Sequence, residues 1–151
     1  MRASLRAEVP VAAPAARVWA YLTDWPRQGE WIPVTRVEEL ADGHRVGGRI
    51  RAWTGLGPVG FWDLMTITAW EQAPDGSARC EVLHTGRVLR GEGEFAVRSL
   101  GEGSCTFTWW ERLELPGGPL GAAAWRLVGP LARRAVDGAL GTMARHVEEA
   151  A

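Results

Sequence analysis

The sequence contains no lysine and no asparagine, and all 17 of its basic residues are arginine. Together with 18 acidic residues they give a net charge of −1, whereas nucleic-acid-binding proteins normally carry a basic excess. Arginine, alanine and glycine are frequent along the whole chain rather than in one segment, which is typical of GC-rich coding. We therefore expect no nucleic-acid partner.

Motifs for cofactor chemistry are also lacking. Two cysteines, Cys80 and Cys105, are too few for a disulfide framework or a cysteine-based metal site. No serine nucleophile motif, phosphate-binding glycine loop or cluster of metal ligands appears in the sequence. We expect neither a metal nor another cofactor.

Long apolar runs are missing as well. No segment approaches the roughly 20 apolar residues that span a bilayer, and the N-terminus lacks the apolar run of a signal peptide. We therefore expect a cytoplasmic protein. Its 151 residues are 46% hydrophobic and 23% charged, which is typical of one soluble domain over residues 1–151. Nine tryptophans are an excess for this length, and we expect their rings to fill a core or line a cavity.

Alternating polar and apolar residues predict strands over most of the chain. A first strand covers Leu5–Val11. Six more, separated by Gly, Pro and Asp-Gly turns, are predicted at Val37–Leu40, Val46–Trp53, Phe61–Trp70, Ala78–Thr85, Gly91–Leu100 and Cys105–Leu115. Such punctuation is typical of hairpins and hence of an antiparallel sheet. Because the 91–100 strand separates those that carry Cys80 and Cys105, the two residues lie roughly 9.5 Å apart and both thiols should be free.

Helical segments precede and follow the six-strand run. Two short ones, Pro14–Leu22 and Trp25–Trp31, lie after the first strand. The segment Leu120–Glu149 has an alanine-rich apolar stripe with helical period, and Gly129-Pro130 should kink or split that helix. A sheet this large must bury one face, and this helix is the only element able to cover it. The sequence predicts an α+β fold in which a curved antiparallel sheet wraps around a long C-terminal helix.

Several segments, in this order, resemble the START-like (helix-grip) superfamily, in its polyketide cyclase/dehydrase and lipid-transport branch. They are VAAPAARVWAYLTDW (11–25), WIP (31–33), VGGRI (46–50), DLMTITAWE (63–71), HTGRVLRGEGEF (84–95), WWERLELP (109–116) and the terminal helix. The resemblance covers essentially the whole chain and implies a β-α-α-β6-α order of elements. It also implies a hydrophobic cavity between sheet and helix for a small lipid-like or aromatic molecule. Members include carriers, hormone and sterol binders, cyclases and co-chaperones, so the resemblance fixes no reaction.

Strand parity indicates which side chains face the cavity. Three ionisable side chains, Asp63, His84 and Glu111, fall on the apolar face. Gly91 and Gly93 lie on the strand between the last two and should leave room between imidazole and carboxylate. The other residues that we predict to line the cavity are Trp31, Met65, Phe95, Trp109, Val128, Ala139 and Met143. For Trp31 the alternative is a plug between helix and sheet.

These patterns leave three functions open. The first is binding of a small hydrophobic molecule, such as an aromatic, polyketide-like or lipid-like one, with the ionisable side chains as the polar end of the cavity. The second is a cyclase/dehydratase-type enzyme that uses His84 with Glu111 or Asp63 as general acid and base. The third is a partner-binding module without a ligand. We favour the first, with the ionisable residues as a satisfied core network remaining the alternative to a functional site. The oligomeric state is left open.

Overall fold

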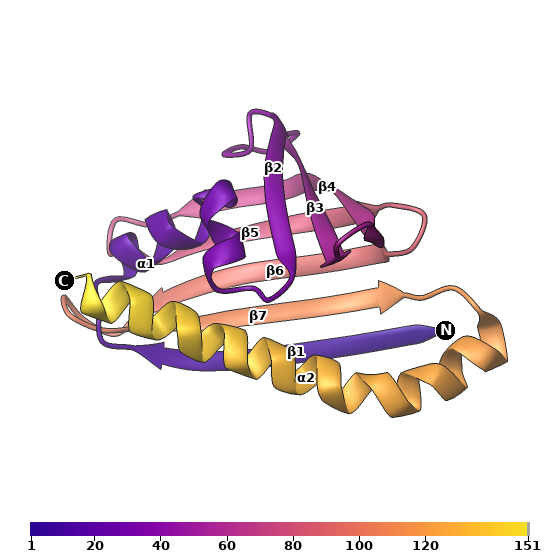
Figure 1. The fold of residues 1–151 in the computed structure, drawn as a ribbon. Helices are drawn as coiled ribbons and strands as arrows, with labels where there is room; N and C mark the ends of the chain where they lie inside the picture. Colours follow the sequence, from indigo (N-terminus) through magenta and orange to yellow (C-terminus); the bar gives the residue numbers. More distant parts are fainter. Residues whose placement is uncertain (151) are drawn as a thin grey trace.

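The structure is a computed structural model that describes residues 1–150, and its elements follow the predicted order (Figure 1). They are β1 (Arg2–Val11), α1 (Ala15–Leu22), the 3-10 helix η1 (Trp25–Glu30), β2 (Thr35–Ala41), β3 (Arg49–Leu56), β4 (Val59–Gln72), β5 (Ala78–Thr85), β6 (Arg90–Ser99), β7 (Cys105–Glu114) and α2 (Gly118–Glu149). Ala151, the last residue of the predicted domain, lies outside the described residues.

The seven strands form one antiparallel sheet in the order β1-β7-β6-β5-β4-β3-β2. Consecutive strands from β2 to β7 are neighbours, and β1 closes the edge beside β7. Figure 1 shows α2 running along β1, with α1 near its C-terminal end. The α+β helix-grip architecture predicted from the sequence is therefore confirmed. Within residues 1–150, no helix has the length and apolar character that crossing a bilayer requires.

The second strand of the predicted six starts later than its apolar pattern indicates. Val46 and the two glycines after it form a turn, so β3 begins at Arg49 rather than Val46. Gly47 has φ +85°, and a Cβ atom on Gly48 would overlap the carbonyl oxygen of Asp42. Only glycine fits both positions, so the chain turns there before the strand can start.

Strand β4 contains a bulge that the sequence did not reveal. Its register against β5 shifts between Ile67 and Ala69, so that Trp70 rather than Ala69 pairs with an inward-facing residue, Cys80. The Trp70 ring consequently packs against Trp19, with 5.2 Å between ring centroids. An extra residue in one strand exchanges the two faces beyond it, and simple alternation misses this exchange.

Helix α2 runs without a break through Pro130, so of the two predicted effects of Gly129-Pro130, a kink or a split, the split does not occur. Pro130 and Arg126 are both exposed, and water can therefore satisfy the Arg126 carbonyl that the proline leaves without a donor. The fully buried residues of α2 all lie beyond this point. They are Ala139, Leu140, Met143, Ala144 and Val147.

The tryptophans divide between the inside and the outside of the sheet. Trp19, Trp25 and Trp31 are buried, as expected. Trp53 and Trp62 instead pair on the outer face at 5.4 Å, with the Arg51 guanidinium 4.2 Å from the centroid of Trp62. The expectation that the tryptophan rings fill the core or line a cavity is wrong for this pair, because arginine covers exposed rings through cation–π contact. Trp110, which strand parity places on the outer face, is likewise covered by the Arg112 guanidinium at 5.1 Å from its ring centroid.

Both cysteines are buried and free, as predicted. Strand β6 lies between them, and they are also offset along the sheet, since Cys80 pairs with Phe95 and Cys105 with Ser99. Burial raises the pKa of the Cys80 thiol to about 12. A thiol that stays protonated at neutral pH is a poor nucleophile, so Cys80 serves as a small apolar side chain.

Candidate functional site

A cavity of about 400 Å³ lies between the inner face of the sheet, the η1–β2 segment and α2. Most of its wall is apolar, and three of its faces come from elements far apart in the sequence. The sheet contributes, among others, Leu5, Ile50, Phe61, Met65, Val82, Phe95, Trp109 and Leu113. Ile32, Pro33 and Val34 close a second side, and Trp125, Ala132, Ala135, Val136 and Ala139 of α2 close the third.

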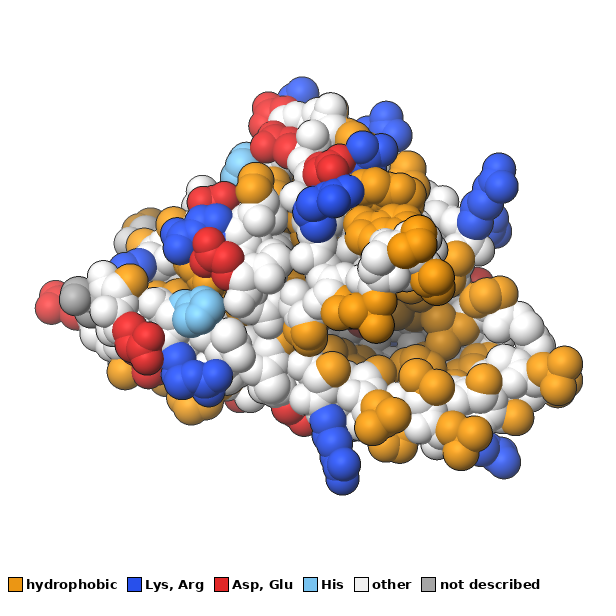
Figure 2. Space-filling model, in the orientation of Figure 1, with side chains coloured by type: hydrophobic (Ala, Val, Ile, Leu, Met, Phe, Trp, Pro, Cys, Tyr) orange, Lys and Arg blue, Asp and Glu red, His pale blue; other side chains and the backbone are white. Residues whose placement is uncertain are grey.

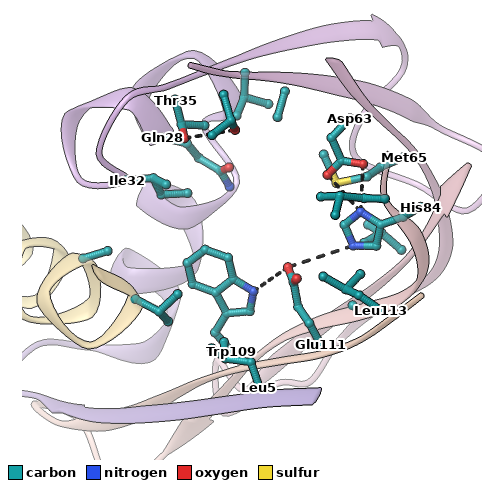
Figure 3. A pocket seen from close by; sticks show the side chains of 18 of the residues that line it. Leu5, Gln28, Ile32, Thr35, Asp63, Met65, His84, Trp109, Glu111 and Leu113 are labelled. Atoms are coloured by element: carbon teal, nitrogen blue, oxygen red, sulfur yellow. Dashed lines mark hydrogen bonds and ion pairs between the residues drawn. The ribbon is translucent and has the colours of Figure 1, made fainter. Parts of the chain in front are cut away.

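One end of the cavity carries a buried pair of ionisable side chains, Asp63 on β4 and His84 on β5 (Figure 3). The imidazole Nδ1 lies 2.9 and 3.0 Å from the two Asp63 carboxylate oxygens. An ionised carboxylate only accepts hydrogen bonds, so Nδ1 carries the proton and donates it. The side chains are only 3% and 9% exposed. Asp63 therefore fixes both the orientation of the ring and the position of its first proton.

The other ring nitrogen of His84 points towards Glu111 of β7 without reaching it. Nε2 lies 3.9 Å from the nearer carboxylate oxygen, which is too far for a hydrogen bond. That oxygen instead accepts a 2.9 Å bond from the indole N–H of Trp109. Nε2 is buried and has no hydrogen-bond partner among the described residues. A buried polar atom without a partner is costly, so a polar ligand atom placed in this gap would be stabilised.

Gly93 of β6 forms the floor beneath this gap. It pairs with Val82 on one side and with Glu111 on the other. A Cβ atom there would lie 3.0 Å from His84 Nε2 and 3.6 Å from Cγ of Glu111. The absent side chain thus leaves the space between imidazole and carboxylate open, as the sequence predicted. Gly91 lies one step further along, between His84 and Leu113, and is not part of the gap.

The environment raises the pKa of both groups that face the gap. Burial lowers the pKa of His84, but the hydrogen bond to Asp63 and the charges of Glu111 and Asp63 outweigh burial, and the net shift is upward. Burial raises the pKa of Glu111, and His84 and the Trp109 N–H offset only part of that increase. His84 therefore holds its second proton more tightly than a free imidazole, and the Glu111 carboxylate is more basic than a free one. The two groups face each other across the gap.

This arrangement can hold a polar group of a ligand and can also move a proton. A hydroxyl placed in the gap can accept a hydrogen bond from protonated Nε2 and donate one to Glu111. A general acid and a general base on either side of a bound molecule are likewise the elements of proton-transfer catalysis. The geometry alone permits both uses.

Seven of the predicted site residues line the cavity and three do not. The seven are Asp63, Met65, His84, Phe95, Trp109, Glu111 and Ala139. Trp31 is buried behind the wall against Phe95, Phe107 and Trp109, so its alternative as a plug is the correct one. Met143 is fully buried in the core beyond the cavity, and Val128 is 52% exposed on the outside of α2. For these three the prediction of a place in the cavity wall is wrong, because helical period gives the side of a helix but not what lies opposite it.

Polar residues on the opposite wall escaped the sequence analysis. Gln28 of η1 and Thr35 of β2 line the cavity across from His84 (Figure 3). The Gln28 amide donates to the carbonyl of Leu22 at 2.9 Å, and the Thr35 hydroxyl donates to the carbonyl of Pro33 at 3.0 Å. Their main bonds are to the backbone, so they shape the wall. No periodic pattern in these short segments marks their direction. Trp125 of α2 also lines the cavity and was not predicted. Helical period gives the apolar side of α2 but does not show which residues of that side lie opposite the cavity.

Outside the cavity, one group of side chains among residues 1–150 has the residue types and spacing of metal ligands. Ligand atoms of Glu39, Asp42 and His44 lie within 4.8 Å of one another on the exposed surface. Each already has a protein partner, since Glu39 accepts from the Gly43 N–H, Asp42 pairs with Arg45, and His44 bonds to the Thr23 carbonyl. None of the three residues lines the cavity.

Comparison with known proteins gives a family and several similar folds. The profile of the family described as polyketide cyclase/dehydrase and lipid transport matches residues 2–148. No curated protein sequence matches the chain significantly. A solved structure from Thermus thermophilus is similar with a TM-score of 0.79 and 22% identity, covering 99% of each chain.

Two further similar structures are of an enzyme and of a superfamily member named as such. The Zhui aromatase/cyclase from a Streptomyces species gives a TM-score of 0.73 at 17% identity, over 98% of this chain and 94% of that one. A START superfamily protein from Mycobacterium smegmatis gives 0.66 at 18% identity, over 97% and 94%. At these identities the likeness concerns the fold.

Proposed function

Because the chain belongs to the polyketide cyclase/dehydrase and lipid transport family, we propose that it binds a small hydrophobic molecule in the cavity, with one polar group of that molecule between His84 and Glu111. The observation that carries this proposal is the unpartnered Nε2 of His84, which points into an otherwise apolar cavity. A ligand hydroxyl there would satisfy Nε2 and Glu111 together, while its apolar body would cover the aromatic and aliphatic wall.

The size and composition of the cavity support an aromatic or polycyclic ligand. Its volume of about 400 Å³ falls within the range of small-molecule sites. Trp109 and Phe95 stand on the sheet side with 5.3 Å between their ring centroids, and Trp125 stands on the helix side. Flat rings of a ligand can stack against these side chains.

A matched pair of probes, 2-naphthol and naphthalene, tests the proposal. The two differ only in a hydroxyl group, and quenching of tryptophan fluorescence can report binding because Trp109 and Trp125 line the cavity. We expect 2-naphthol to bind about tenfold more tightly to the wild-type protein, as one well-formed hydrogen bond to a charged group provides. His84→Gln and Glu111→Gln should each remove most of this preference and leave naphthalene binding in place.

Glu92→Gln provides the matched control, since Glu92 lies on the outer face and pairs with Arg112. This variant should keep the preference for 2-naphthol. Equal binding of the two probes by the wild-type protein would contradict the proposed role of the gap. If neither probe bound, the cavity would not be a ligand site, and the partner-binding function would take precedence.

A second candidate function, proton-transfer catalysis in cyclisation or dehydration, is favoured by one specific observation. Asp63 orients His84 so that Nε2 and the Glu111 carboxylate face each other at 3.9 Å across open space. In a dehydration, Glu111 would take a proton from carbon, and the His84 imidazolium would protonate the leaving hydroxyl, which departs as water. Conversion of a β-hydroxy carbonyl compound, with turnover reduced by about 10²–10⁴ in both His84→Gln and Glu111→Gln, would establish this function. Bound compound recovered unchanged would favour the carrier.

A further inference from the structure

The first half of α2 exposes a row of large apolar side chains. Leu120, Leu127 and Leu131 are 83%, 79% and 63% exposed, and Val128 is 52% exposed. Their spacing of three, four and seven residues places them on one side of the helix. This side adjoins the one from which Trp125 and Ala132 face the cavity. Soluble proteins seldom present so continuous an apolar row to water.

Two sheet loops at the same end of the molecule add to this row. Leu56 and Val59 flank the β3–β4 turn and are 73% and 76% exposed, and Val88 in the β5–β6 loop is 37% exposed. Figure 2 shows apolar side chains gathered around a hollow over the first half of α2 and the β3–β4 hairpin. We call these seven residues the mouth surface: Leu56, Val59, Val88, Leu120, Leu127, Val128 and Leu131.

The charge around the mouth surface is predominantly positive. Two acidic residues at this end of the sheet, Glu92 and Glu114, form ion pairs with Arg112 and Arg2. Residues 54–61, 85–91 and 115–136 contain five arginines, at positions 87, 90, 126, 133 and 134, and no acidic residue. Within residues 1–150 none of these five guanidinium groups forms an ion pair. At the other ends of the strands, the turns carry Asp42, Asp75 and Glu102 instead. A chain with a net charge of −1 thus has a locally cationic, apolar end.

We propose that the mouth surface docks on an anionic lipid bilayer. Protruding leucines can enter the boundary between headgroups and acyl chains, while the surrounding arginines meet anionic headgroups. Lipid closes around each protruding side chain, so the surface does not have to be flat or complementary in shape. A purely electrostatic partner would leave the leucines in water, and a purely apolar partner would leave the arginines unpaired.

Docking in this way would place the cavity against the lipid. Trp125 and Ala132 line the cavity from the side of α2 that adjoins the exposed side carrying Leu127 and Leu131. A hydrophobic molecule could then pass between bilayer and cavity without crossing water. The docking itself depends only on the surface, so it can be tested without knowing what the cavity binds.

Vesicle flotation with the full chain tests the proposal. We expect the wild-type protein to float with vesicles of phosphatidylcholine and phosphatidylglycerol, to stay largely unbound with phosphatidylcholine alone, and to be released by added salt. Leu127→Ser/Leu131→Ser and Arg133→Gln/Arg134→Gln should each weaken binding to the anionic vesicles about tenfold or more. All four positions are exposed, so the variants should fold, which thermal unfolding verifies.

Matched controls come from the opposite end of the sheet. Leu100→Ser removes a leucine that is 52% exposed in the β6–β7 turn, and Arg98→Gln removes an exposed arginine near the end of β6. Both should bind anionic vesicles as the wild type does. Equal binding to both vesicle types, or equal weakening by the control variants, would overturn the proposal. So would a dimer in sedimentation equilibrium that Leu127→Ser/Leu131→Ser dissociates, because the surface would then be an interface between two copies of this chain.

Discussion

The two halves of α2 carry similar apolar patterns and meet different surroundings. Beyond residue 138, Leu140, Met143 and Val147 are at most 2% exposed against the sheet and α1. Before residue 132, Leu120, Leu127 and Leu131 are at least 63% exposed. The side chains of α2 that face the cavity are Trp125 and those between Ala132 and Ala139. One helix therefore serves in turn as a surface, a cavity wall and a core element.

This difference shows what an amphipathic period means and what it leaves undecided. The period states that one side of a helix is apolar, but the sheet, the cavity and the solvent can each lie opposite that side. The C-terminal half of α2 packs against the curved sheet, whereas the N-terminal half lies at the end of the sheet where the cavity opens (Figure 1). Two kinds of substitution should separate these roles experimentally, and a third test, of pH dependence, should be insensitive to both halves of the helix.

Truncation of a leucine in each half should give the largest contrast. Leu140→Ala removes a side chain that is 1% exposed, and we expect it to lower the free energy of unfolding by about 2–5 kcal/mol through lost burial and a new cavity. Leu127→Ala should change it by about 0.5 kcal/mol or less, because that side chain is already in water. Urea unfolding measures both. Comparable losses would mean that the first half of α2 is packed rather than exposed.

Enlargement of two alanines should separate cavity wall from core. Ala144 packs within the core, and Ala144→Phe should cost about 1–3 kcal/mol through overpacking. Ala139 is equally buried but lines the cavity, so a phenylalanine there can turn into open space and should cost less. Ala139→Phe should also weaken binding of both naphthalene and 2-naphthol, whereas Ala144→Phe should not do so selectively. Equal destabilisation in urea would argue that the space beside Ala139 is not available to a side chain.

The smallest effect concerns pH, and neither half of α2 contributes to it. The raised pKa of His84 adds stability that is present below its ordinary value of 6.5 and is lost as pH rises through the folded-state pKa. Glu111 also holds its proton more tightly in the folded state, so its contribution likewise falls as pH rises above 4.5. The melting temperature should therefore decrease as pH increases from 4.5 to the folded-state pKa of His84.

The double variant His84→Gln/Glu111→Gln should flatten this dependence, while Leu127→Ala should retain the wild-type slope. Thermal unfolding monitored by circular dichroism at a series of pH values measures the difference. A slope that persists in the double variant would assign the dependence to other groups.

Strand residues were predictable from the sequence to the extent that their alternation is regular. On β5 and β7, simple alternation placed His84 and Glu111 inward, and both line the cavity. On β4 it also placed Asp63 correctly, since the bulge begins only after Ile67. The Asp63–His84 hydrogen bond was not specified, because the register between β4 and β5 depends on the loop and the bulge rather than on either strand alone.

The sequence by itself determined the order of elements, the antiparallel sheet, the inward side of each regular strand and the absence of a disulfide between Cys80 and Cys105. These depend on local geometry, where a period of two or 3.6 residues and the turn residues are sufficient. Only the tertiary structure decided that α2 stays continuous through Pro130, that Trp31 and Met143 lie behind the cavity wall, and that Val128 faces outward. Those outcomes depend on the curvature of the whole sheet and on which residues remain in contact with water, and no single segment encodes either of them.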